Sequence, residues 1–210
     1  MIRRHPRLAL FTLSYLLAAA WGLFATGNRE FLLYFVQMLL LIGLIAWADQ
    51  RARFSSGVLW GLSVWGLLHM AGGLVPVSLE RAEADPDETS AVLYSFWLIR
   101  GVLKYDHVVH AFGFFMATLA CAEAMRRYVR QDERRTLAFY LVLACAGMGL
   151  GAVNEIVEFT ATVMFPENNV GGYVNNSLDL VCNGIGAVLA AASSWVKDAK
   201  LVRAGKAGSS

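Results

Sequence analysis

Six long apolar runs constrain this chain more than any other feature. A helix needs about 20 mostly apolar residues to cross the hydrocarbon core of a bilayer. Segments of that character occur at 8–25, 31–48, 57–77, 106–124, 137–158 and 178–196. With 57% hydrophobic and only 16% charged residues, the chain cannot cover so many apolar segments with polar surface. The sequence therefore predicts an all-α polytopic membrane bundle, with a single transmembrane domain over 1–196 and a polar tail over 197–210.

The basic residues predict how the bundle is oriented. Lysine and arginine are retained on the cytoplasmic side of a membrane, and 14 of the 18 basic residues lie before the first segment, on the second and fourth connections, or after the last segment. The other four are Arg29, Arg81, Arg100 and Lys104. This pattern predicts that both termini, and the polar tail, are cytoplasmic. The first 22 residues also have the basic, apolar and small-residue sections of a signal peptide, and cleavage of the first segment stays open.

Seven polar residues on four of these segments fall at nearly one depth. At a rise of 1.5 Å per residue, they lie roughly 21–35 Å above the cytoplasmic edge, in the outer third of the bilayer. They are His69, Asp106, His110, Glu155, Glu158, Asp179 and Asn183. Spacings of three or four residues place each pair from one segment on a shared helix face. The sequence predicts that these residues form one layer.

Each residue also has a plain structural interpretation. Asp106 and Asp179 open their segments, where a carboxylate caps free amide groups, and His69 is typical of a hydrogen-bonded histidine near a helix end. Glu155 and Glu158 fit such an interpretation less well, because the helix dipole opposes negative charge near the end of their segment. Four carboxylates at one depth repel one another unless some are protonated or a cation lies among them. Ionisable groups at membrane depth usually mark a function.

A divalent cation would offset the negative charge of the four carboxylates, and this gives each polar residue a predicted role. Asp106, His110, Glu155 and Asp179 are the predicted ligands of a divalent metal ion whose identity stays open. Glu158 is the predicted general base or a further ligand. The residues predicted to orient the ligands or the substrate are His69, His107 and Asn183.

Four stretches carry a resemblance to known families. They are LHMAGG at 68–73, YDHVVHAFGFF at 105–115, NEIVEF at 154–159 and LDLVCNGIGAVLA at 178–190. In order and spacing they resemble the YjdF-like family of uncharacterised bacterial inner-membrane proteins and, more distantly, the VanZ-like proteins associated with teicoplanin resistance. The sequence departs from that pattern near Val75 and at His107, where a basic or polar residue such as arginine or lysine is expected, and this histidine is a further candidate for the site. The resemblance implies a multi-pass protein of the bacterial cytoplasmic membrane and a shared site, without a settled chemistry.

Three functional classes remain open. The first is a metal-dependent hydrolase of a lipid-linked or envelope substrate, the second an ion-coupled transporter, and the third a non-enzymatic envelope protein that binds lipid headgroups or a partner. The transporter is disfavoured because no second polar layer lies at mid-depth or in the cytoplasmic half. A net charge of +2 gives no reason to expect nucleic acid, and membrane lipids are the expected contacts. The oligomeric state stays open.

Two loops and a set of glycines give further expectations. The apolar stretch 92–104, with Arg100 and Lys104, predicts a helix in the outer interface that roofs the polar layer. The turn-rich stretch 165–177 is a candidate mobile lid. Five glycines predict close contacts between the last two helices and their neighbours; they are Gly147, Gly149, Gly151, Gly184 and Gly186.

Overall fold

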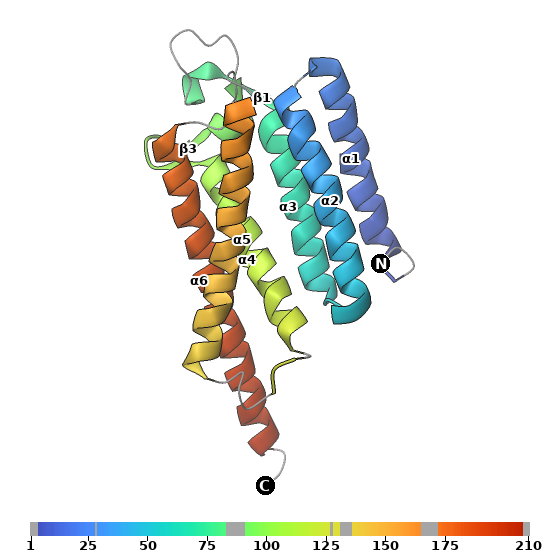
Figure 1. Cartoon of the computed structure of the whole chain (residues 1–210), viewed down its shortest axis with the longest axis vertical. Coiled ribbons are helices and arrows are strands. Elements are labelled where there is room, and N and C mark those ends of the chain that lie inside the picture. Colours follow the sequence, from blue (N-terminus) through green and yellow to red (C-terminus); the bar gives the residue numbers. More distant parts are fainter. Residues whose placement is uncertain are drawn as a thin grey trace.

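Six helices dominate the computed structural model, which describes residues 4–27, 29–82, 91–126, 128–130, 136–164 and 172–207. They are α1 (Pro6–Thr26), α2 (Arg29–Ala52), α3 (Ser56–Leu74), α4 (Tyr105–Met125), α5 (Leu137–Met164) and α6 (Tyr173–Ala207). Each is long and apolar enough to span a membrane, which confirms the predicted all-α membrane bundle. The start of α1 and the end of α6 lie at the same end of the molecule (Figure 1).

The helices depart from the predicted segments mainly at their ends. Helix α3 ends at Leu74 rather than at residue 77, because Pro76 disfavours helical geometry in the residue before it. Helix α6 begins at Tyr173 and ends at Ala207, well beyond the predicted 178–196. Hydropathy identifies only the apolar part of a helix. Polar residues at either end can continue the backbone hydrogen bonds of the helix, so the helix is longer than its apolar part.

The connection between α3 and α4 lies at the end of the bundle opposite the termini (Figure 1). Its regular elements are β1 (Pro76–Val77), η1 (Leu79–Arg81), β2 (Ala91–Val92), η2 (Leu93–Ser95), β3 (Trp97–Ile99) and β4 (Leu103–Lys104). Strand β1 pairs with β2 and β3 with β4, both antiparallel. The predicted interfacial helix over 92–104 is therefore wrong. The physical reason is Gly101, whose φ of 72° lets the chain turn back, between short runs rich in aromatic and β-branched residues that favour strands.

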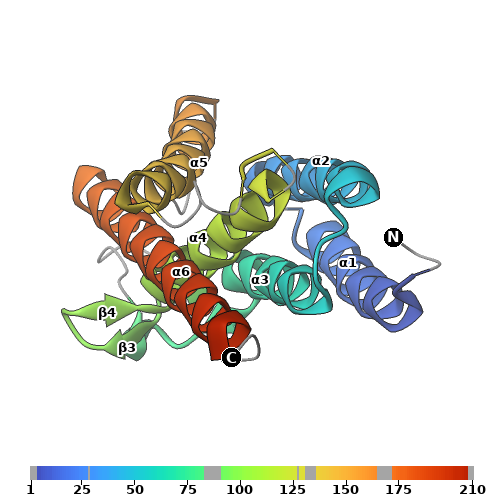
Figure 2. The ribbon, with the colours of Figure 1, turned by 90° about the horizontal axis from the view of Figure 1, so that it is seen from below.

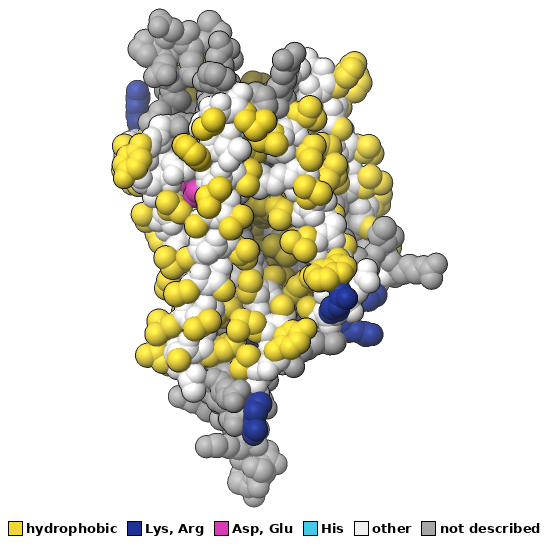
Figure 3. Space-filling model, viewed as in Figure 1, with side chains coloured by type: hydrophobic (Ala, Val, Ile, Leu, Met, Phe, Trp, Pro, Cys, Tyr) yellow, Lys and Arg dark blue, Asp and Glu magenta, His cyan; other side chains and the backbone are white. Residues whose placement is uncertain are grey.

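Helix α4 is the central element of the bundle. It packs against α3, α5 and α6, and α6 runs along both α4 and α5 (Figure 2). Buried aromatic and aliphatic side chains such as Tyr15, Phe31 and Met70 join the first three helices into one core. A second core, around Leu143 and Ala191, joins the last three helices. On the face shown in Figure 3, hydrophobic side chains are spread over the described helices and charged ones are few, as a lipid-facing surface requires.

The predicted glycine contacts are confirmed at three positions and wrong at two. A Cβ atom on Gly186 would lie only 2.1 Å from the carbonyl oxygen of Ala111 on α4. On Gly147 and Gly151 it would lie 2.0 Å and 2.8 Å from side-chain atoms of a neighbouring helix. In contrast, a Cβ atom on Gly149 would have no atom of another element within 4 Å, and one on Gly184 would meet only a methionine methyl group at 3.8 Å. The backbone of α4 therefore lies directly against α6 at Gly186, about one turn from the predicted site residue Asn183.

Candidate metal centre

Three helices bring six of the predicted site residues together. Helix α4 supplies two, α5 two and α6 two, and we call this set the polar cluster: Asp106, His110, Glu155, Glu158, Asp179 and Asn183. Four of its members are at least 95% buried, whereas the side chains of Asp106 and Glu158 retain 14% and 13% exposure. The depth count along the sequence therefore placed residues from three separate segments correctly in one layer.

The imidazole of His110 lies at the centre of the polar cluster. Its Nε2 atom is 3.3 Å from Asp106 Oδ1 and 3.7 Å from Glu158 Oε1. Its Nδ1 atom is 3.0 Å from Asn183 Oδ1 and 3.4 Å from Glu155 Oε1. A protonated imidazole here would offset part of the carboxylate charge, and a neutral imidazole would offer one nitrogen as a ligand.

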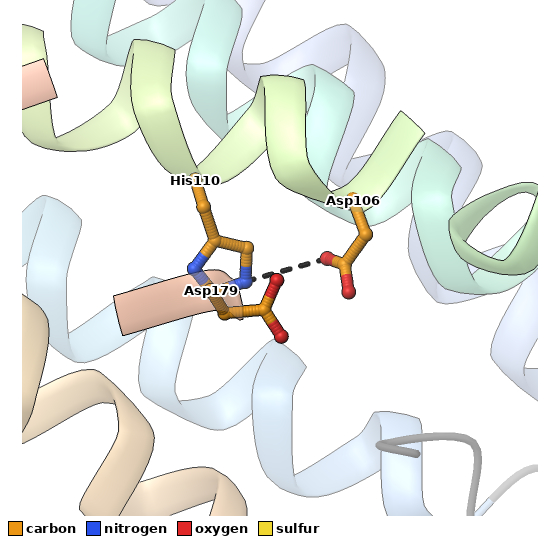
Figure 4. Close-up of side chains that lie close together, drawn as sticks. All are labelled: Asp106, His110 and Asp179. Carbon is orange, nitrogen blue, oxygen red and sulfur yellow. Dashed lines mark ion pairs between the residues drawn. The ribbon is translucent and has the colours of Figure 1, made fainter. Parts of the chain in front are cut away.

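Two groups within the polar cluster have the geometry of a metal site. Asp106, His110 and Asp179 each offer one ligand atom, and these atoms lie within 4.8 Å of one another. Figure 4 shows these three side chains pointing toward a common point. His110, Glu155 and Glu158 form a second such group around the same imidazole. Ligand bonds near 2 Å place two ligands of one ion up to about 4 Å apart, so small side-chain movements would complete either site.

Asp179 has a buried oxygen atom that no hydrogen bond satisfies within the described residues. Its side chain is fully buried on α6, with 0% exposure. Oδ2 accepts a hydrogen bond from Asn175 Nδ2 at 2.8 Å, but Oδ1 has no hydrogen-bond partner within the described part of the chain. A buried carboxylate oxygen without a donor costs free energy, and a bound cation would remove that cost.

Hydrogen bonds that involve two asparagines and Glu155 orient the imidazole of His110. Asn183 donates from Nδ2 to Glu155 Oε1 at 2.8 Å, and Asn176 donates to Glu155 Oε2 at 2.7 Å. Because its Nδ2 atom faces Glu155, Asn183 turns its carbonyl oxygen toward His110 Nδ1, which then carries a proton to donate. The lone pair of a neutral His110 is consequently on Nε2, on the side of Asp106.

Sequence reasoning missed two asparagines and a lysine beside these residues. Asn175 donates to Asp106 Oδ2 at 3.3 Å as well as to Asp179, and it accepts from the buried Lys104 ammonium group. Asn175, Asp179 and Asn183 follow one another at intervals of four residues. That spacing marks one helix face, and it was overlooked because α6 was expected to begin only at residue 178.

The same extension of α6 decides between two interpretations of Asp179. Helix α6 begins at Tyr173, so Asp179 lies in its second turn and does not cap the helix. Asp106 is in the first turn of α4, where its charge is favourable for the dipole, but Lys104 occupies the N-cap position. Residues 165–171 of the candidate lid lie outside the described residues, and 173–177 are helical.

The two other predicted histidines lie outside the polar cluster. His69 forms a hydrogen bond with the hydroxyl of Tyr94 and stacks on Trp65, with ring centroids 5.4 Å apart. His107 is buried in the first turn of α4 and accepts a 3.3 Å hydrogen bond from the Lys104 amide. Burial, with the nearby charges of the polar cluster, raises the pKa of Tyr94 well above its usual range. Tyr94 is thus a neutral side chain that links the connection between α3 and α4 to His69 on α3.

Comparison with protein families identifies the family to which the chain belongs. No curated protein and no solved structure matches the chain. A family match extends over residues 7–199, which include every member of the polar cluster. On this match, the chain belongs to the family described as "Predicted membrane protein" (DUF2238).

Proposed function

We propose that the polar cluster binds a divalent metal ion and that the protein is a metal-dependent hydrolase of a lipid-linked or envelope substrate. The observation that carries the proposal is the buried Asp179 Oδ1 atom, which no described group donates to and which belongs to the same group as Asp106 and His110. One imidazole nitrogen and two carboxylates suit Zn²⁺ or Mn²⁺. Such an ion lowers the pKa of a bound water and polarises a phosphoryl or acyl group.

The two glutamates take different roles in this proposal. Both oxygens of Glu155 already accept amide hydrogen bonds, so Glu155 holds Asn183 and through it His110, although it remains available as a further ligand. Glu158 accepts one hydrogen bond, from Asn154 at 2.7 Å, and its Oε1 atom is 3.7 Å from His110 Nε2. It is therefore the better candidate for the base that takes a proton from water.

The position of the polar cluster supports a substrate that arrives from the lipid phase. Its residues are carried on membrane-spanning helices. The side chains of Asp106 and Glu158 are 14% and 13% exposed, so a substrate can reach them, whereas Asp179 is fully buried. A substrate with an apolar tail could present its polar group at this level without leaving the membrane.

The orientation and location are part of the same proposal. We place the polar cluster toward the outer surface of a bacterial inner membrane, with both termini cytoplasmic, because the basic residues gather on alternate connections. The YjdF-like resemblance, with its distant VanZ-like similarity, agrees with this location.

The decisive experiment is a hydrolysis assay on the purified full chain in detergent. It would follow phosphate release from a prenyl diphosphate and fatty-acid release from a phospholipid, before and after chelation. Glu158→Gln should keep the metal but lower metal-dependent release by about 100-fold or more. Asp198→Asn is the matched control, because Asp198 pairs with Tyr140, away from the polar cluster. Metal-loaded protein that hydrolyses neither substrate would favour the third class, a headgroup-binding protein.

A further inference from the structure

A second feature lies at the other end of the bundle, where both termini are found. A cavity of about 380 Å³ opens there between α3, α4 and α6. Its polar lining comes from all three helices and includes Ser55, Glu123, Arg126, Ser194 and Lys197. This cavity shares no residue with the polar cluster.

The charges of the cavity leave an excess of positive charge. Glu123 Oε2 accepts a 2.7 Å hydrogen bond from the Ser55 amide at the start of α3, so its charge is offset by the positive end of that helix. Arg126 caps the C-terminal end of α4 and Lys197 lies on α6, and neither forms an ion pair within the described ranges. Two cations from different helices facing one cavity are the arrangement that binds a phosphate group.

The rest of the cavity lining is apolar. Val58, Met116, Leu119 and Ala122 form this part of the wall, and Met116 and Ala122 are largely buried. A cavity with cations at one part and aliphatic side chains at another fits a ligand that is itself amphipathic. A free anion would leave the apolar wall without a contact.

We propose that this cavity binds the phosphate-bearing headgroup of an anionic phospholipid, with Arg126 and Lys197 on the phosphate and the first acyl carbons along Met116 and Leu119. The cavity lies at one end of the membrane-spanning helices, which is the depth of a headgroup. Two basic residues beside a membrane surface are also what attracts anionic lipids. The site is independent of the proposed metal chemistry and would regulate or anchor the bundle from the opposite leaflet.

The test measures lipid binding to the delipidated full chain in neutral detergent by native mass spectrometry. The probes are phosphatidylglycerol, diacylglycerol with the same acyl chains, and inorganic phosphate. Phosphatidylglycerol should bind and diacylglycerol should not. Arg126→Gln and Lys197→Gln should each weaken binding about fivefold, and Arg126→Lys should largely restore it. Lys200→Gln removes an exposed charge that does not line the cavity, and it should leave the affinity unchanged.

Three results would overturn the proposal. The first is equal binding of diacylglycerol, which would make the phosphate irrelevant. The second is an equal loss of affinity in Lys200→Gln, which would show diffuse attraction rather than a site. The third is inorganic phosphate that binds as tightly as the lipid and displaces it, which would assign the cavity to the free anion. Melting curves of each variant without lipid show whether it is folded before its binding is compared.

Discussion

Replacement of Gly186 by alanine should separate α4 from α6 and disable the polar cluster. The new Cβ atom would lie 2.1 Å from the Ala111 carbonyl oxygen, about 1.3 Å closer than the 3.4 Å at which ordinary contact begins. Because the opposing atoms are backbone, no side-chain rotation relieves the overlap, and the helices must move apart by about that amount. The His110 Nδ1 to Asn183 Oδ1 distance, now 3.0 Å, would then exceed hydrogen-bond range.

Gly186→Ala should lower the stability of the fold because it overpacks a close contact between two helices. Such overpacking typically destabilises by about 1–3 kcal/mol. Gly184→Ala is the matched control on the same helix, because its Cβ would meet only a methyl group at 3.8 Å, and removing a helical glycine should stabilise by about 0.5–1 kcal/mol. Thermal unfolding in detergent should place Gly186→Ala several degrees below the wild type and Gly184→Ala at or slightly above it.

Metal content would be measured on the same two preparations, and only Gly186→Ala should lose the ion. If both variants melted at the wild-type temperature and kept equal metal, the contact of Gly186 with the backbone of α4 would not be a tight one. The dependence of the polar cluster on that contact would then be refuted.

Three further predictions concern other parts of the bundle. Asn183→Leu leaves the His110 and Glu155 hydrogen-bonding atoms without their amide partner and should lower the unfolding free energy by about 2–5 kcal/mol, read from chemical denaturation; an unchanged midpoint would refute the orienting role. Tyr94 has a raised pKa in the folded chain, so its contribution to stability is complete below the unfolded pKa of about 10 and declines at higher pH; Tyr94→Phe should lack that decline in melting curves from pH 9 to 11. Arg130→Cys, in a background without the three native cysteines, should react with a membrane-impermeant thiol reagent only from the cytoplasmic side, and labelling from outside would invert the proposed topology.

The polar cluster was largely predictable because helices convert sequence spacing into depth. Asp106 and His110, four residues apart, share a face of α4, and counting from the nearest basic residues placed them level with Glu155 and Asp179. A rise of 1.5 Å per residue holds in any membrane-spanning helix, so residues on separate segments can be aligned without a known fold. The same count did not give rotation about the helix axis, so it could not predict which groups each side chain contacts; His69 bonds Tyr94 and stacks on Trp65 instead of contacting His110.

The elements that the sequence did not predict are those where hydropathy carries little information. Asn175 and Asn176 are polar and precede the apolar part of α6, so they were assigned to a loop, although they are helical and bind the carboxylates. The stretch around Gly101 is apolar enough for an interfacial helix. The structure instead has two paired strands, with a turn at Gly101 between them. Glycine spacing alone also could not separate Gly186, which contacts the backbone of α4, from Gly184, where an added Cβ would meet only a methionine methyl group at 3.8 Å.

Metal analysis of the purified wild-type chain and of Asp179→Asn tests the central claim most directly. Asparagine keeps the size of the side chain but removes the charge of the carboxylate whose Oδ1 atom has no described donor. We expect about one divalent ion per wild-type chain, loss of that ion in Asp179→Asn, and a melting temperature that rises with added metal only in the wild type. A wild-type chain that carries no stoichiometric ion, and that Mg²⁺, Mn²⁺, Zn²⁺ and Ca²⁺ all fail to stabilise, would contradict the metal site and the hydrolase built on it.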